Sequence, residues 1–280
     1  MTSERLRFVP ASLVSLEEYA EAFTAGFSGY YMPLTLDAAR LARKVRVEQC
    51  DLQHSLIAYE GDRHAGAAVL AIRGYEGWVG GFGVVPELRG QGVGRLLMEA
   101  LLESARAARL RRLSLEVLSQ NVAARRLYEA VGMRTAREML VLERGTVGDA
   151  GPPALEGRAL EEAPREELLS HFVRLHPIAP AWQRDLPTHL AGRSRGLRLG
   201  ERESPRAYAL VSPEPVDGYT YLTDLAAADA DAARELSAGL ACVGGALRVI
   251  NEPEQSLFVA PLIEYGFAVS YRQHEMAIEL

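Results

Sequence analysis

A short glycine-rich stretch holds the residues best suited to binding a charged ligand. Gly90, Gly92 and Gly94 alternate there with larger residues. Glycine has no side chain, so several backbone N–H groups can approach one ligand closely. Apolar residues recur at helical spacing from Val93 to Ala105, which predicts an amphipathic helix whose positive N-terminal end meets the loop. A phosphate or pyrophosphate is the expected ligand.

Two other phosphate-binding loops do not fit this stretch. A dinucleotide-binding fingerprint that began at Gly92 requires glycine where Leu97 stands. A P-loop requires Gly-Lys-Ser or Gly-Lys-Thr, but the only lysine in the chain is Lys44, far upstream. The loop therefore belongs to neither class.

The segments on either side of the loop predict the elements that position it. Residues 78–85 read as a strand with three glycines, and glycine inside a strand marks a bulge or a close backbone approach. After the helix, residues 113–117 alternate as a second strand, with Glu116 on its less apolar face. A carboxylate in a core strand costs free energy unless it is paired or hydrated, so Glu116 is a candidate functional residue.

A further helix is predicted over about residues 123–131. Asn121 precedes this helix and Gly132 closes it. Its spacing turns Leu127 toward the core and Tyr128 toward the mouth of the proposed site.

The run from Arg89 to Gly94 resembles the Arg/Gln-x-x-Gly-x-Gly/Ala loop of the GCN5-related N-acetyltransferase (GNAT) superfamily. Asn121 and residues 127–133 resemble that superfamily's "Asn…Leu-Tyr-Glu…Gly-Phe" helix. The resemblance implies one acetyl-CoA per chain, with its pantetheine arm in a gap beside the bulged strand. The residues implied to bind acetyl-CoA are Val84, Val85, Arg89, Gly90, Gln91, Gly92, Val93, Gly94, Arg95, Asn121 and Tyr128.

The resemblance also assigns roles to Glu116 and Tyr128. The pattern "Leu-Glu-Val…Asn…Leu-Tyr-Glu" is similar to that of the bacterial ribosomal-protein N-terminal acetyltransferases, which implies that Glu116 is a general base and Tyr128 a general acid. Structural alternatives stay open for both. Glu116 could pair with a nearby arginine and only shape the pocket, and Tyr128 could be a half-buried aromatic with its hydroxyl on a backbone carbonyl.

Tyr30 and Tyr31 lie in an aromatic segment with turn residues, which is unusual for a plain connector. In acetyltransferases of this type, the loop between the first two helices commonly forms part of the acceptor pocket. The resemblance therefore implies that both tyrosines bind substrate. An equal alternative is that they close the surface of the domain.

The whole pattern predicts an α/β (α+β) fold of two tandem GNAT-like domains, each a mixed, mostly antiparallel twisted sheet flanked by helices. A catalytic domain is expected over residues 1–144, a linker over 145–154 and a degenerate domain over 155–280. In the first domain, the segments before the loop are strands at 6–9, 55–59 and 65–72, helices at about 15–27 and 36–47, and a hairpin tip at His64. In the second domain they are helices at 166–175 and 231–243 and strands at 207–211, 219–225, 247–250 and 275–280.

The second domain lacks the residues expected to bind the cofactor. Where the first has its glycine loop, the second has alanines interrupted by Asp229 and Asp231, whose methyl groups and carboxylates oppose a pyrophosphate. Ile263 stands near the place of Tyr128 and cannot donate a proton. The second domain is expected to supply rigidity only or a wall of the acceptor site.

Composition narrows the class of partner. The chain has 280 residues, 48% of them hydrophobic and 24% charged, with a net charge of -6, which argues against a nucleic-acid partner and mildly favours a cationic amine. No apolar leader or membrane span is apparent, so a cytoplasmic protein without a membrane partner is expected. Cys50, Cys242 and the six histidines show no metal-ligand spacing, so no metal is expected.

These observations together predict transfer of an acetyl group from acetyl-CoA to a primary amine of a small molecule by direct attack. A protein N-terminus as acceptor and a non-catalytic acyl-CoA sensor stay open as alternatives. The sequence does not reveal the acceptor, the acyl-chain preference or the oligomeric state.

Overall fold

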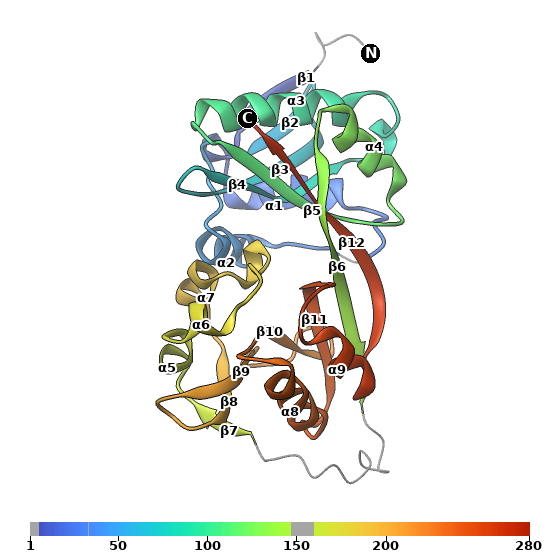
Figure 1. The fold of residues 1–280 in the computed structure, drawn as a ribbon. Helices are drawn as coiled ribbons and strands as arrows, with labels where there is room; N and C mark the ends of the chain where they lie inside the picture. The colour runs from blue at the N-terminus through green and yellow to red at the C-terminus, as the bar shows by residue number, and fades with distance from the viewer. Residues whose placement is uncertain (1–5, 33, 147–159) are drawn as a thin grey trace. The chain divides into compact units, whose positions relative to one another are not determined.

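The computed structural model describes residues 6–32, 34–146 and 160–280. The chain divides into two compact units, which we treat separately (Figure 1). Unit 1 consists of Met1–Ala136 and Glu275–Leu280, and unit 2 of Arg137–His274. Within the described ranges, no helix combines the length and the apolar character needed to cross a membrane.

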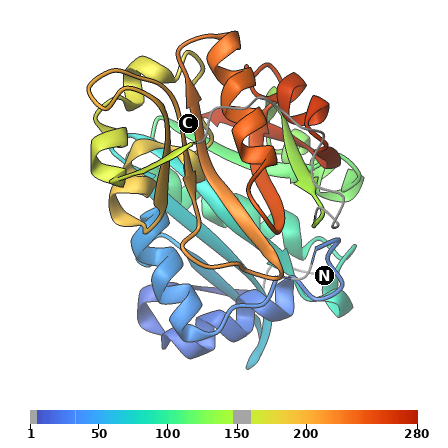
Figure 2. The same cartoon turned by 90° about the horizontal axis from the view of Figure 1, so that it is seen from below.

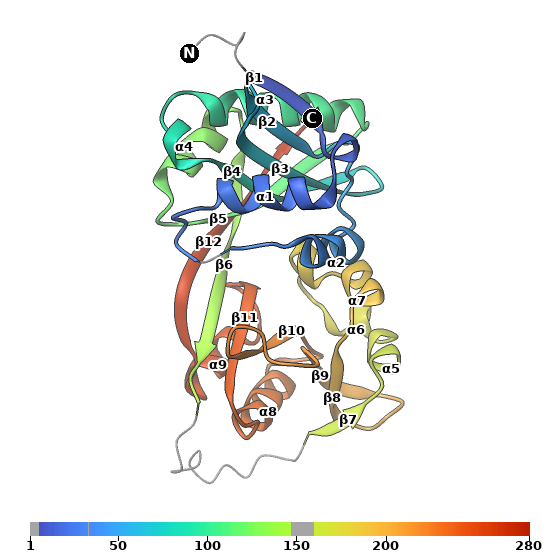
Figure 3. The same cartoon turned by 180° about the vertical axis from the view of Figure 1, so that it is seen from behind.

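Unit 1 is a sheet with helices on both faces. The strand order is β1 (Leu6–Pro10), β2 (Leu56–Glu60), β3 (Arg63–Arg73), β4 (Glu76–Val84), β5 (Arg112–Leu118) and the end of β12 (Ala268–Glu279). The first four strands pair antiparallel in sequence, and β4 pairs parallel with β5. The helices are α1 (Leu16–Gly26), α2 (Ala38–Glu48), α3 (Val93–Ala107) and α4 (Val122–Ala130). Figures 1 and 3, seen from opposite sides, show α3 over one face of the sheet and α1 over the other.

The core of unit 1 follows from the predicted periodicity. Leu97 and Leu101 of α3 are fully buried together with Leu113 of β5. Helix starts are fixed by side-chain caps, since Ser15 accepts from the Glu18 N–H at 3.1 Å and Asp37 from the Arg40 N–H at 2.7 Å. His64 lies on β3 and not at the hairpin tip, with Nε2 3.6 Å from a Glu18 carboxylate oxygen.

Unit 2 repeats the order of unit 1. Its strands run in the order β12, β6 (Arg134–Arg144), β11 (Ala246–Pro253), β10 (Tyr219–Ala227), β9 (Pro205–Val211), β8 (Arg195–Gly200) and β7 (Glu161–Ala163), with β10 and β11 parallel. The helices are α5 (Arg165–Leu169), α6 (Phe172–Leu175), α7 (Leu186–Ala191), α8 (Ala230–Ala241) and α9 (Val259–Glu264). Figure 2 shows α8 and α9 in orange-red and red on one side of these strands, and the yellow α5–α7 on the other. The expected fold class is confirmed.

Two expectations for unit 2 need correction. The single helix expected over 166–175 is two helices, α5 and α6, because the chain turns at Ser170, whose hydroxyl donates to the Glu167 carbonyl at 2.6 Å. Strands β7 and β8 and helix α7 were not expected. They are short, and their stability comes from tertiary contacts that no local pattern encodes.

The units also differ from the expected domain boundaries. Residues 137–144 belong to unit 2, and the last residues of β12 belong to unit 1, where Met276 is fully buried and Ile278 packs against the same core. Each of the strands β6 and β12 therefore starts in one unit and ends in the other. Most of the expected linker, residues 147–154, lies outside the described residues.

Candidate active site

The glycine loop before α3 is open on its ligand side. Gly90 and Gly92 have φ angles of +73° and +85°, which favour glycine, and a Cβ added at either would meet no atom within 4 Å. Gly92 is the N-cap residue of α3, and it has no side chain that could accept a hydrogen bond from the N–H groups of the first turn. The Leu96 N–H is bonded to the Gly92 carbonyl, so the N–H groups before it are the ones that a 15-residue helix offers to a ligand.

Side chains of the loop mostly turn away from this opening. The Arg89 guanidinium donates to the carbonyls of Gly26 at 3.1 Å and Ser28 at 2.6 Å, and its Nε donates to Val84 at 2.9 Å. Arg89 therefore ties the end of α1 to the end of β4, and the structure does not direct it at the loop. The exposed Arg95 pairs with Glu99 at 2.8 Å.

Gln91 also uses its side chain within the loop. Its Nε2 donates to the Glu87 carbonyl at 2.7 Å. What the loop presents outward is thus mainly backbone, in agreement with the reason for its glycines.

Strand β4 leaves one edge unpaired beside the loop. The register with β3 joins Val69 to Gly81 and Leu70 to Val79, so Gly80 is an extra residue, and the predicted bulge is confirmed. β4 and β5 pair only over Glu76–Trp78 and Arg112–Ser114, although both strands continue.

The backbone N–H groups of Val84 and Val85 point to opposite edges of the strand. The Val85 N–H donates to the Ala65 carbonyl at 3.0 Å, on the β3 side. Because neighbouring residues of a strand turn their N–H groups to opposite edges, the N–H groups of Val84 and Phe82 face the unpaired edge. Of the two valines expected to bind acetyl-CoA, only Val84 can bond a ligand at the unpaired edge. Phe82 can bond a ligand at the same edge.

Glu116 lies on β5 just past the last residue paired with β4. Its Oε2 accepts from the Trp78 Nε1 at 2.8 Å. The nearby cation is Lys44 of α2, whose pKa Glu116 helps to raise.

Tyr128 is the buried residue of α4, with 6% of its surface exposed. The expectation that it lies at the mouth of the site is wrong, because its ring packs edge-on against Phe82 of β4, with centroids 6.1 Å apart. Burial, with a smaller contribution from Tyr30, raises the pKa of the Tyr128 hydroxyl above its ordinary value. The hydroxyl stays protonated at neutral pH and suits a proton donor.

Tyr30 and Tyr31 both bind the turn that precedes α4. Burial raises the pKa of Tyr30, and a hydrogen bond to the Asn121 side chain opposes that shift. The Tyr31 hydroxyl donates to the Gln120 carbonyl at 3.3 Å. Asn121 caps α4 by accepting from the Ala124 N–H at 3.2 Å. The structure thus brings both tyrosines to the Asn121 end of the helix that carries Tyr128.

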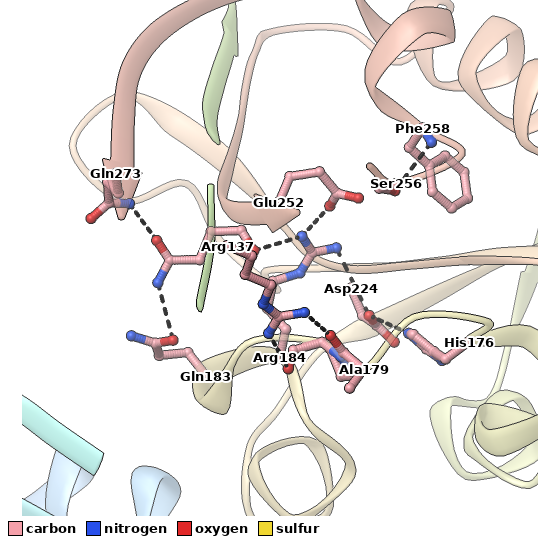
Figure 4. A network of polar contacts seen from close by, with 12 residues as sticks. Arg137, His176, Ala179, Gln183, Arg184, Asp224, Glu252, Ser256, Phe258 and Gln273 are labelled. Atoms are coloured by element: carbon pink, nitrogen blue, oxygen red, sulfur yellow. Dashed lines mark hydrogen bonds and ion pairs between the residues drawn. The ribbon is translucent and has the colours of Figure 1, made fainter. Parts of the chain in front are cut away.

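A different arrangement occupies the matching place in unit 2. β10 and β11 pair only over Tyr219–Tyr221 and Ala246–Arg248, and Thr223 is the extra residue of β10, as Gly80 is of β4. Beyond the paired part, Arg184 Nη2 lies 3.9 Å from Asp224 of β10, and Arg184 Nη1 also bonds Glu252 of β11 (Figure 4).

The charged side chains of this cluster are buried, and each lies in contact with a group of opposite charge or a hydrogen-bond partner. Asp224 has no exposed surface and also accepts from the Tyr208 hydroxyl at 2.9 Å. His176 Nε2 lies 3.1 Å from Asp224 Oδ1 and its Nδ1 2.9 Å from the Phe172 carbonyl, so both ring nitrogens face acceptors. Burial lowers the pKa of His176, but Asp224 and Phe172 raise it by more. A cationic imidazole satisfies both contacts.

The geometry of unit 1 agrees with comparisons to known proteins. A profile of the Acetyltransferase (GNAT) family matches residues 16–133, the segment that contains the loop, Glu116 and Tyr128. Residues 16–133 therefore form a GNAT-type acetyltransferase domain. GNAT enzymes take their acetyl group from acetyl-CoA. Among curated proteins, none matches the sequence significantly.

Solved GNAT structures resemble the whole chain. A GCN5-related N-acetyltransferase from Sphaerobacter thermophilus is 17% identical, with a TM-score of 0.69 over 100% of this chain and 97% of that one. A tandem GNAT protein from the clavulanic acid biosynthesis pathway is 15% identical, with a TM-score of 0.69 and 98% of both chains covered. A putative acetyltransferase from Pyrococcus horikoshii is 15% identical, with a TM-score of 0.67 over 100% and 91%. These similarities establish the fold of both units.

Sequence reasoning missed three residues of the site. Phe82 packs on Tyr128, Trp78 binds Glu116, and Lys44 lies over the Trp78 ring. Lys44 carried a usable signal, since it is the single lysine of an arginine-rich GNAT chain. Trp78 and Phe82 look like ordinary apolar strand residues, so only the fold could reveal their partners.

Proposed function

We propose that unit 1 is an N-acetyltransferase domain that binds one acetyl-CoA between the open start of α3 and the unpaired edge of β4. The observation that carries this proposal is the uncapped first turn of α3 at Gly92, next to a strand edge that pairs with nothing on β5 after Trp78. A diphosphate complements the helix end, and an amide-containing arm complements the strand edge. The described residues therefore fit both polar parts of this cofactor.

The loop residues hold the diphosphate mainly through backbone N–H groups. Gly90 and Gly92 keep that backbone accessible, with Gln91 between them, and Gly94 after Val93 lets the helix start pack closely on Leu127 and Val84. Arg95 is exposed and adds a positive charge near the diphosphate. We assign Arg89 to the support of the loop, because its guanidinium is bonded to backbone carbonyls.

Two side chains move protons in this proposal. Acetyl-CoA supplies an acetyl group activated as a thioester. Glu116 takes a proton from the acceptor amine, directly or through a water, and the Tyr128 hydroxyl donates a proton to the departing sulfur. Because burial raises the pKa of the Tyr128 hydroxyl, that group carries its proton at neutral pH and can donate it. The N–H groups of Phe82 and Val84 are placed to polarise or align the bound arm.

The acceptor that we propose is a primary amine of a small molecule. Two carboxylates, those of Glu116 and Glu48, lie on the Lys44 side of the site. These carboxylates and the net charge of -6 on the chain both favour a cationic amine as the acceptor. Tyr30 and Tyr31 support a bounded acceptor site, since their hydroxyls fix the segment after α1 to the turn before α4. A protein N-terminus stays the alternative, and an open groove at these tyrosines would favour it.

A thiol-release screen tests the activity. The full chain is incubated with acetyl-CoA and panels of amine metabolites, amine antibiotics and short peptides, and free CoA is measured. Release that depends on a small amine supports the proposal, and release that depends only on peptides favours the alternative acceptor. Calorimetry with acetyl-CoA measures the stoichiometry, for which we expect one site per chain.

A further inference from the structure

The single lysine of the chain lies beside the proposed base. Lys44 is the one lysine among 31 basic residues, and its side chain is only 16% exposed. It pairs with Glu48 one turn later on α2. A lysine ammonium is a compact point charge, whereas arginine presents a broad planar fork, so this position selects the smaller cation.

Helix α2 holds Lys44 in a fixed place. The helix starts at the Asp37 cap. At its other end, Gln49 accepts at its carbonyl from the Ile72 N–H at 3.1 Å, and the Asp51 N–H donates to the Leu70 carbonyl at 2.7 Å. Both ends of the segment are thus tied down, the second one to β3.

Trp78 connects Lys44 to Glu116. The Lys44 ammonium lies 5.0 Å from the centre of the Trp78 ring, and the indole N–H reaches Glu116 at 2.8 Å. The ring is 3% exposed and lies across the bulge, where a Cβ on Gly80 would come within 2.5 Å of it. The indole therefore has little freedom to turn away from the carboxylate.

Some charges near Glu116 favour its ionised form, and others oppose it. Burial lowers the pKa of Lys44, but Glu48, Cys50 and Glu116 raise it by more. Because the attraction between two groups is mutual, the ammonium favours the ionised form of Glu116 to the same degree. The Glu48 carboxylate, which is bonded to Lys44, weakens this effect of the ammonium on Glu116.

We propose that Lys44 and Trp78 are positioning residues for Glu116: the indole N–H fixes the orientation of the carboxylate, and the ammonium keeps it negatively charged. This inference rests on the proposed function, in which Glu116 accepts the proton of the acceptor amine. It adds a reason for the lone lysine and a function for Trp78, the last residue of β4 that pairs with β5.

Tryptophan fluorescence provides a test that does not require activity. The chain has two tryptophans, so Trp182→Phe leaves Trp78 as the only one. Ionisation of a carboxylate bonded to the indole changes its emission, so a pH titration reports Glu116. Glu116→Gln should abolish that transition. In the same background, Lys44→Met should raise the midpoint by about 1 pH unit, the lower end of the usual effect of an opposite charge.

Lys44→Arg is the matched control, because it keeps the charge. The midpoint of this variant should stay near that of the parent, even if the larger guanidinium group lowers the rate of acetyl transfer. Circular dichroism verifies that each variant is folded. A midpoint that Lys44→Met leaves in place, or a transition that persists in Glu116→Gln, overturns the proposal.

Kinetics separate this proposal from the proposed function. Trp78→Phe should lower kcat by about 10-fold, the effect of losing one hydrogen bond to a charged group, with KM for acetyl-CoA unchanged. If Glu116→Gln leaves the transfer rate unchanged while Lys44→Met still shifts the midpoint, the base role fails and the electrostatic coupling stands. If Lys44→Met leaves the midpoint unchanged while the parent enzyme transfers acetyl groups, the coupling of Lys44 to Glu116 is refuted and the proposed function is not.

Discussion

Helices α3 and α8 begin at matching points of the two units, but their first turns differ. α3 follows β4 and starts at Gly92, which has no side chain. α8 follows β10 and starts at Asp229, whose Oδ1 accepts from the Ala232 N–H at 2.7 Å. A carboxylate in the cap satisfies the helix end and repels a second anion. An anion is therefore favoured at α3 and opposed at α8.

The strands that precede these helices differ in the same sense. β4 and β10 each carry one extra residue and each pair only briefly with the parallel strand. Beyond that point Phe82 and Val84 of β4 offer backbone N–H groups, whereas Arg184 bonds the Asp224 and Glu252 side chains in unit 2. The comparison teaches that the same arrangement of two parting strands can hold open backbone in one unit and internal ion pairs in the other.

Gly92→Asp gives α3 the cap of α8 and should abolish acetyl-CoA binding. A carboxylate about 4 Å from a phosphate charge opposes binding by about 4 kcal/mol at an effective dielectric constant of about 20, so we expect a loss of at least about 100-fold in affinity by calorimetry. Gly92→Asn is the control of equal size without the charge, and asparagine tolerates positive φ. An equal loss in both variants would attribute the effect to the backbone and not to charge.

Met276→Ala tests which unit the end of β12 stabilises. Met276 is fully buried in the core of unit 1, so its truncation should lower the free energy of unfolding of that unit by about 2–5 kcal/mol. Chemical denaturation monitored at Trp78 or Trp182, in single-tryptophan variants, reports the two units. Met139→Ala is the matched control, since Met139 is equally buried in unit 2. A transition that moves only at Trp182 in Met276→Ala would contradict the assignment.

Tyr128→Phe should lower turnover by about 10- to 1000-fold, because the ring keeps its contact with Phe82 while the proton donor is lost. KM for acetyl-CoA should change little in steady-state assays. Since the pKa of Tyr128 is raised, ionisation of this group should not limit the rate of the parent enzyme below about pH 10. Tyr75→Phe, which removes a hydroxyl from an exposed ring between β3 and β4, serves as the control. Unchanged kcat in Tyr128→Phe would remove Tyr128 from the mechanism.

Asp229→Ala should have a small effect on stability and no effect on stoichiometry. Loss of the α8 cap should cost about 0.5–2 kcal/mol in the free energy of unfolding. Calorimetry should still find one acetyl-CoA per chain, because Arg184 keeps its contacts with Asp224 and Glu252. Ser15→Ala, which removes the cap of α1, should cost a similar amount. A second binding site in Asp229→Ala would show that the cap alone excluded the cofactor.

Local patterns in the sequence were enough to predict much of this comparison. The glycine loop, the helix after it, the Asn121 cap and the bulge of β4 each depend on residues close in the chain. The family profile confirms the GNAT assignment that these patterns indicated.

What could not be predicted depends on contacts between distant residues. Arg89 lies in the loop motif, yet its guanidinium bonds Gly26 and Ser28, which only the fold brings near. Tyr128 was expected at the mouth of the site, but the position of Phe82 buries it. The arginine that bonds the parting strands of unit 2 comes from a short 3-10 turn at residues 182–184 with no distinctive pattern.

The end of β12 also determines the order in which the protein can fold during synthesis. Residues 137–274 leave the ribosome before Met276 and Ile278, although these two complete the core of the unit with the glycine loop. Unit 1 therefore completes its core only after the whole of unit 2 has been made. A chain that ends at residue 136 lacks both of these side chains, so we expect it to be less stable than unit 1 of the full chain.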